Sequence, residues 1–101
     1  MLEFLFTQGW HINSSNELKL VATDDSMAPL ILAGDILIVD KSIRDLSRVL
    51  VLIHDGKMFA RWVKPSLEGG YELVSGNRET PGISVERLNI VGAVIATARG
   101  L

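Results

Sequence analysis

The sequence predicts a mainly β domain, a small barrel or sandwich-like sheet with several short strands and little helix. Three observations lead to this prediction. Short apolar or alternating runs have the length of strands, turn signals separate them at close intervals, and helical periodicity is almost absent. The expected strands are residues 18–23, 36–39, 49–53, 58–63, 71–75, 83–85 and 89–98.

Each expected strand has a local reason. The run LKLVAT at 18–23 alternates, whereas ILIV at 36–39 and VLVLI at 49–53 are continuously apolar. Asp55-Gly56 predicts a tight hairpin between 49–53 and 58–63, because both residue types tolerate the positive φ of such turns. Pro29 favours a turn or a helix of about one turn, and Gly92 is a candidate bulge position in the last strand. The remaining turn signals are Gly69-Gly70, Gly76-Asn77 and Pro81-Gly82.

The chain divides into a lead-in, residues 1–17, and a single domain, residues 18–101. We expect the lead-in to pack its aromatics, Trp10 among them, on the domain. The opening MLEFLF lacks the basic flank and small-residue cleavage site of a signal peptide. No apolar run approaches the roughly 20 residues that span a bilayer. We therefore expect a cytoplasmic protein that does not contact a membrane.

Composition excludes several chemistries. The chain has no cysteine, so it has no disulfide, thiolate nucleophile or cysteine metal site. His11 and His54 are the only imidazoles and lie far apart in sequence, so we expect neither a metal nor a cofactor. The formal net charge is −2 and the charges are mixed along the chain. A domain that grips nucleic acid usually carries a basic stripe, so this chain by itself is not expected to hold DNA.

Several ordered motifs resemble those of the S24 peptidase family, which includes LexA, UmuD and phage repressors of the lambda CI type. The first is VATDDSMAP at 21–29, followed by GDILIVD at 34–40. The resemblance continues through FARWV at 59–63 and LVSGN at 73–77 to IVGAVI at 90–95, and so covers nearly the whole chain. It implies a small LexA- or signal-peptidase-like β-barrel domain, closest in pattern to prophage repressors.

The resemblance implies a serine–lysine dyad, and this chain has only half of it. Ser26 stands at the nucleophile position, but the position of the dyad lysine is Arg61. A lysine activates the serine when it is neutral, whereas a guanidinium cannot be neutralised in a protein. Lys64 points to the opposite face of the expected strand from residue 61, and Lys57 lies roughly 13 Å along it. We therefore expect Arg61 to be non-functional as a base and self-cleavage to be impaired.

Two readings of Arg61 remain open. It either donates hydrogen bonds to Ser26 or a neighbouring carboxylate, or it pairs with an acid on the surface of the strand. Asp24 stands where the family usually has glycine, and the backbone N–H groups near Asp25 and Ser26 are the natural oxyanion donors. Self-cleavage also needs a scissile Ala-Gly or Cys-Gly bond. The only Ala-Gly, at 33–34, lies inside a predicted turn.

The favoured expectation is the C-terminal dimerisation and regulatory domain of a phage or prophage transcriptional repressor. In that reading the chain forms a homodimer to which residues 89–98 contribute. It would reach DNA only through an N-terminal helix-turn-helix domain that this chain lacks. Two alternatives remain. One is an active self-cleaving peptidase that uses Ser26 in the SOS response, with the RecA filament as partner. The other is a UmuD-like accessory factor for error-prone DNA synthesis.

Overall fold

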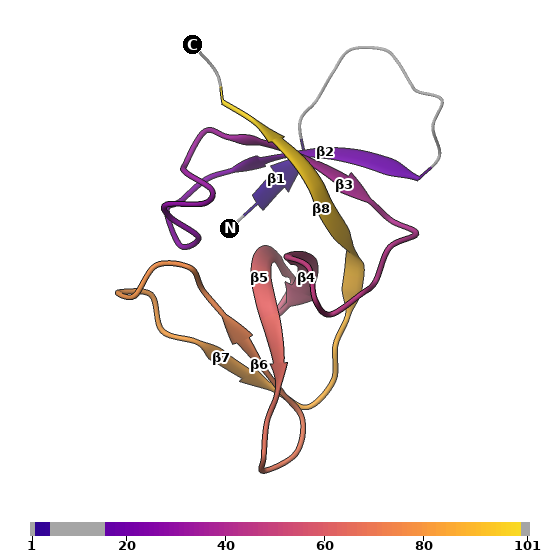
Figure 1. The fold of residues 1–101 in the computed structure, drawn as a ribbon, viewed down its shortest axis with the longest axis vertical. Coiled ribbons are helices and arrows are strands. Elements are labelled where there is room, and N and C mark those ends of the chain that lie inside the picture. The colour runs from indigo at the N-terminus through magenta and orange to yellow at the C-terminus, as the bar shows by residue number, and fades with distance from the viewer. Residues whose placement is uncertain (1, 5–15, 100–101) are drawn as a thin grey trace.

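The computed structural model describes residues 2–4 and 16–99, and these form strands joined by turns and loops, without a helix (Figure 1). The mainly β prediction is confirmed. The expected strands all occur, with ends shifted by no more than two residues. The strands are β1 (Leu2–Phe4), β2 (Glu17–Ala22), β3 (Ile36–Asp40), β4 (Leu50–His54), β5 (Lys57–Pro65), β6 (Tyr71–Val74), β7 (Ile83–Val85) and β8 (Ile90–Ala98).

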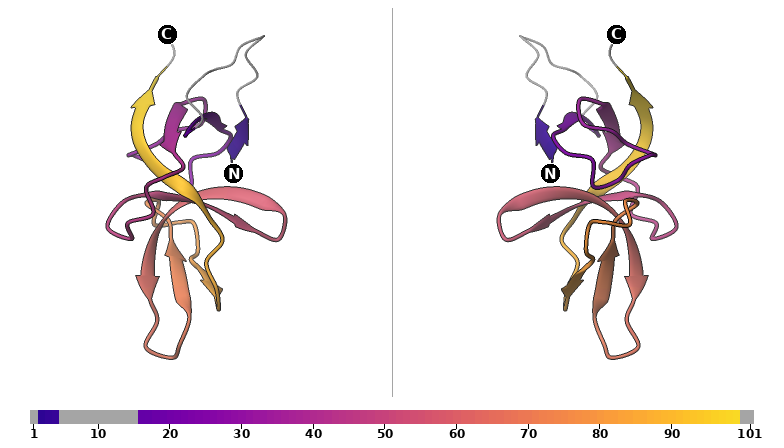
Figure 2. Two further views of the ribbon diagram at one scale, coloured as in Figure 1. Left: turned by 90° about the vertical axis from the view of Figure 1, so that its right-hand side faces the viewer. Right: turned by 90° about the vertical axis from the view of Figure 1, so that its left-hand side faces the viewer.

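Six strands close into a barrel, and the other two extend from it. The antiparallel order is β1-β2-β3-β8-β4-β5, and β1 also pairs with β5, which completes the ring. The first half of β5 pairs with β4, while its second half pairs with β6, which in turn pairs with β7. This β5–β6–β7 arm projects from one end of the barrel (Figure 2). The molecule is accordingly elongated, with extents of 45 × 27 × 23 Å.

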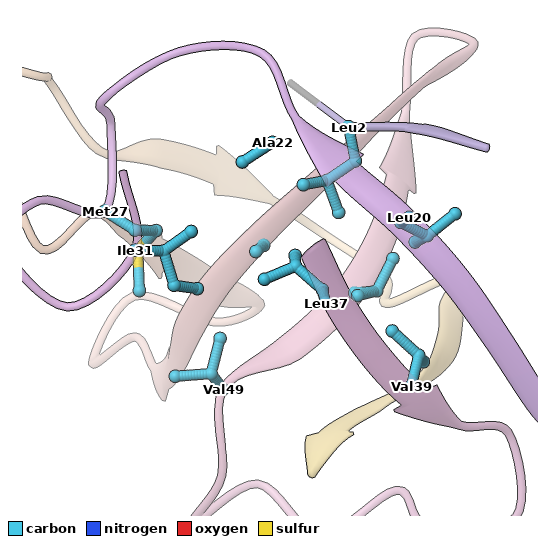
Figure 3. Close-up of a cluster of buried hydrophobic side chains, with 10 residues drawn as sticks. Leu2, Leu20, Ala22, Met27, Ile31, Leu37, Val39 and Val49 are labelled. Carbon is cyan, nitrogen blue, oxygen red and sulfur yellow. The ribbon is translucent and has the colours of Figure 1, made fainter. Parts of the chain in front are cut away.

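Strand β4 lies between two hydrophobic cores, which explains its continuous apolar run. Val51, with Val49 just before the strand, packs into the barrel core with Leu20, Leu37 and others (Figure 3). Leu50 and Leu52 point the other way, into a second core that includes Val63 and Leu73 of the arm. Successive side chains of a strand face opposite sides, so the segment between the two cores, residues 49–52, is apolar at every position, whereas Ile53 and His54 beyond it are exposed and half-buried.

The turn and bulge expected from glycine occur where the backbone requires them. Asp55 and Gly56 have φ of 52° and 75°, the positive values of a two-residue hairpin turn. In β8 the register shifts between the pairs Val51–Gly92 and Leu52–Ile90, so the bulge adjoins Gly92. A Cβ on Gly92 would lie 2.4 Å from the carbonyl oxygen of Asp40, which only glycine avoids.

One feature differs from the sequence analysis. Residues 2–4 lie in the expected lead-in, yet they form β1 and belong to the barrel wall. Pro29 lies in a turn, one of the two structures expected for it, and the Ala28–Pro29 peptide bond is cis. Trp10 and His11 lie outside the described residues. Within residues 2–4 and 16–99, no helix is long and apolar enough to cross a membrane.

Candidate functional site

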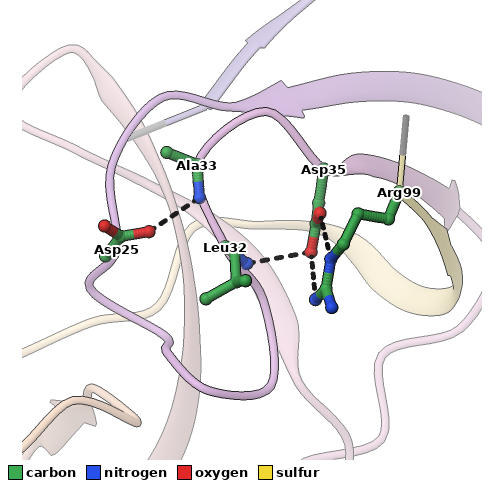
Figure 4. A network of polar contacts seen from close by, with 5 residues as sticks. All are labelled: Asp25, Leu32, Ala33, Asp35 and Arg99. Carbon is green, nitrogen blue, oxygen red and sulfur yellow. Dashed lines mark hydrogen bonds and ion pairs between the residues drawn. The ribbon is translucent and has the colours of Figure 1, made fainter. Parts of the chain in front are cut away.

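The loop between β2 and β3 carries Ser26, and buried or bridging carboxylates fix its shape (Figure 4). Asp25 Oδ1 accepts a hydrogen bond of 2.8 Å from the Ala33 N–H. The buried Asp35 accepts one of 2.9 Å from the Leu32 N–H and two more from the Arg99 guanidinium, at 2.8 and 2.9 Å. These bonds close the loop on itself and tie it to the end of β8, so the serine is held by a rigid segment.

The turn after β6 supports the same loop from the arm. Asn77 donates through its side-chain amide to the Asp25 carbonyl and through its backbone N–H to the Ser26 carbonyl, both at 3.0 Å. The Gly76 N–H lies 3.1 Å from Met27 Sδ, and a Cβ on Gly76 would come within 2.9 Å of the Met27 carbonyl oxygen. The sequence marked Gly76-Asn77 only as a turn. Its second role, as a support for the serine loop, depends on tertiary contacts.

Ser26 and Arg61 lie together in the protein interior. Their exposed fractions are 8% and 3%. Arg61 Nη1 donates to Ser26 Oγ at 2.8 Å and to the backbone carbonyl of Ala60, also at 2.8 Å. Arg61 enters the site from β5, where its register partner is Leu50 of β4. Of the two readings of Arg61, the structure therefore has the one in which the guanidinium contacts the serine rather than a surface acid.

The surroundings of Arg61 leave it a cation. Its Cζ lies 5.0 Å from the centroid of the Phe59 ring, a cation–π distance. Its Nε has no hydrogen-bond partner among the described residues. Burial lowers the pKa of the Arg61 guanidinium, and the charge of Asp24 opposes that change. Because arginine stays protonated under any condition in which proteins fold, Ser26 Oγ faces a hydrogen-bond donor and not a base.

Neither of the two lysines of β5, Lys57 and Lys64, replaces the missing base. Lys57 and Lys64 are both exposed. Lys57 pairs with His54 next to the hairpin turn, and Lys64 pairs with Glu72 in the arm. The register of β5 therefore keeps both lysines away from the serine, as the alternation of the strand predicted for Lys64 and the distance along the strand predicted for Lys57.

The Asp24 carboxylate occupies a backbone N–H group that an oxyanion hole would need. Its Oδ1 accepts the Ser26 N–H at 3.1 Å. Burial acts to raise the pKa of Asp24, but hydrogen bonds, those of the Ser26 N–H and hydroxyl among them, outweigh burial and lower it to about 2. At neutral pH a carboxylate therefore occupies one of the two N–H groups that the sequence analysis named as oxyanion donors. Glycine at this position would leave that N–H free.

The space beside Ser26 is small. A cavity of about 10 Å³ adjoins it, room for one water molecule and not for a peptide segment. Leu2 of β1 forms part of its wall and is itself buried. In this conformation, then, β1 helps to close the site. The other lining residues are Ala22, Asp24, Met27, Ile31 and Ala60.

The fold and the site together define a β-barrel domain that holds a loop serine against a basic residue of a neighbouring strand, the arrangement of a serine–lysine peptidase with the base exchanged. A family model described as Peptidase S24-like matches residues 3–95, and the chain belongs to that family. No curated protein matches the chain. Among residues 2–4 and 16–99, no three His, Asp or Glu side chains cluster in a way that could hold a metal ion.

Proposed function

We propose that this chain is a dimer-forming regulatory domain of a transcriptional repressor, with an S24 site that does not cleave. The main support for a silent site, one that does not cleave, is the 2.8 Å hydrogen bond from Arg61 Nη1 to Ser26 Oγ. For acyl transfer, Ser26 Oγ must lose its proton to a base as it bonds to the carbonyl carbon. A guanidinium has no lone pair for that proton, and the Asp24 carboxylate that bonds to the hydroxyl has a pKa of about 2 and is therefore a weak base, so the hydroxyl stays unactivated.

If the S24 site does not cleave, we infer that the domain acts by binding a partner. A groove on its surface is the candidate binding site. A groove of about 330 Å³ runs beside the second half of β8. Leu30, Trp62 and Ile95 line it, with exposed fractions of 53, 37 and 41%. Exposed apolar side chains gathered in one groove are typical of interaction sites. The proposed occupant is a second copy of the chain, because the family resemblance assigns the last strand to a two-fold interface.

Dimerisation would serve repression through the geometry of the operator. Two heads joined by one dimer bind a two-fold site as a single unit, so two weak contacts become one tight complex. The net charge of −2 gives this chain no electrostatic grip on phosphate, and DNA contact is assigned to a separate helix-turn-helix domain.

The dimer is tested by sedimentation velocity over a range of protein concentrations. The wild type is expected to shift from monomer to dimer, and Ile95→Glu to remain monomeric, because a charge in the groove would be buried against the partner. Leu67→Glu is the matched control, since Leu67 is fully exposed in the turn between β5 and β6 and lies outside the groove. A wild type that stays monomeric at every concentration would overturn this part of the proposal.

The silent site is tested by incubating the protein at alkaline pH, and separately with RecA filaments, followed by mass spectrometry of the products. The chain is expected to remain intact under both conditions. Fragments that form in the wild type and vanish in Ser26→Ala would show an active self-cleaving enzyme instead.

A further inference from the structure

The β5–β6–β7 arm has a sheet edge without a partner in the described part of the chain. Strand β7 is the last strand of the sheet, so only its inner edge is paired, with β6 (Figure 1). Apart from this ladder, β7 makes no backbone hydrogen bond among the described residues. An unpaired strand edge presents N–H and C=O groups with which an extended segment of another chain can pair.

A pocket of about 230 Å³ lies beside this edge and is called the arm pocket below. The turn between β5 and β6 forms one side of it, and β7 with the residue after it forms another. Gly70 allows the turn to lie against β7, because a Cβ at this position would come within 2.4 Å of the Val85 carbonyl oxygen. The volume is below the roughly 300–1,000 Å³ of small-molecule sites, and suits one long side chain.

The lining of the arm pocket favours a cation. Glu68, in the turn, and Glu86, just after β7, both line it and are exposed, and neither forms an ion pair among the described residues. Lys64 and Arg87 are close in sequence but do not line the pocket. The half-buried Tyr71 adds an aromatic ring, whose face attracts cations. Two carboxylates and a ring are complementary to a guanidinium or an ammonium group.

We propose that the outer edge of β7 and the arm pocket together form a docking site for an extended protein segment that carries an arginine or a lysine. The segment adds a strand to β7. Alternate side chains of a strand face the same side, so one basic side chain can enter the pocket while the backbone pairs with the edge. This inference goes beyond the proposed function, because neither the silent site nor the dimer enters it.

The probe is the peptide acetyl-Thr-Val-Arg-Val-Thr-amide, titrated to millimolar concentration into the ¹⁵N-labelled chain and followed by ¹H–¹⁵N NMR. Chemical shifts are expected to change at the amides of β7 and of the turn between β5 and β6. The same peptide with glutamate in place of arginine is expected not to bind, and N-methylation of the two valine amides is expected to weaken binding. Shift changes that are absent, confined to the groove beside β8, or equal with the glutamate peptide would overturn the proposal.

Glu68→Gln and Glu86→Gln are each expected to weaken binding of the arginine peptide by about fivefold, the upper range for one exposed ion pair. Glu79→Gln is the matched control, because Glu79 is an exposed glutamate of the turn after β6 that does not line the arm pocket. Its affinity is expected to equal that of the wild type. Equal weakening by all three variants would show a general effect of charge and would contradict a specific site.

Sedimentation separates this site from the proposed dimer. The arm pocket and the groove beside β8 share no lining residue, so Glu86→Gln is expected to sediment like the wild type. A wild type that stays monomeric but still binds the arginine peptide at β7 would remove the dimer and leave this inference intact. Loss of the dimer in Glu86→Gln would show that a second copy covers the edge of β7, and the inference would then be wrong.

Discussion

Replacing Ser26 by alanine tests whether this serine now serves structure rather than chemistry. In the structure, Arg61 Nη1 donates to two acceptors, Ser26 Oγ and the Ala60 carbonyl, while its Nε has none among the described residues. Ser26→Ala removes one of these acceptors from a buried cation. A hydrogen bond to a charged group contributes about 1.5–3 kcal/mol, so we expect the free energy of unfolding to fall by about that amount.

The assay is urea unfolding followed by tryptophan fluorescence and circular dichroism, with thermal unfolding as a check. For a domain of this size, each kcal/mol corresponds to about 4–8 °C in Tm. Ser42→Ala is the control, because the exposed Ser42 hydroxyl also makes a side-chain hydrogen bond, 2.6 Å to Asp40, but at the surface. It is expected to lose less than about 1 kcal/mol.

The sign of the effect distinguishes the two roles. Residues kept for catalysis often sit in sites that are not optimal for stability, and their removal is then neutral or stabilising. A Ser26→Ala protein as stable as the wild type, or more stable, would refute the view that the serine hydroxyl anchors the arginine.

The remaining predictions concern the barrel and its acid sensitivity. Gly92→Ala is expected to lower the free energy of unfolding by about 1–3 kcal/mol, because its Cβ would lie 2.4 Å from the Asp40 backbone oxygen. Gly82→Ala is the control and should cost less, because its nearest contact, at 2.8 Å, is the flexible carboxylate of Glu72. Equal losses in the two variants would contradict the argument. Hydrogen bonds from Arg99 and from the Leu32 N–H lower the pKa of Asp35 to about 2 from its ordinary 3.8. This group therefore stabilises the fold fully above about pH 4 and progressively less as the pH falls towards 2. Arg99→Gln should reduce the loss of urea resistance between those pH values, and an unchanged acid profile would count against the assignment.

The sequence was a good guide to the strands and to the two central residues of the site. Alternation, apolar runs and the Asp55-Gly56 turn are local signals, and they located the strands because each acts over only a few residues. The ordered motifs also pointed to Ser26 and Arg61 as residues that belong together, although 35 positions separate them. The charge chemistry of arginine predicted that position 61 lacks the family's base, but it left open whether the guanidinium contacts Ser26 or a surface acid, and the 2.8 Å bond to Ser26 Oγ decides this.

Tertiary structure alone decided how the site is held and closed. The apolar pattern of residues 2–4 is too short to predict a strand. Nevertheless, these residues pair with both β2 and β5 and so close the barrel. This pairing also places Leu2 at the cavity beside Ser26. The support from Asn77 and the bond between Asp24 Oδ1 and the Ser26 N–H likewise left no mark in the pattern. Local propensity determines which segments form strands. Strand pairing and side-chain contacts depend instead on how segments far apart in the sequence pack together, and this packing exists only in the folded molecule.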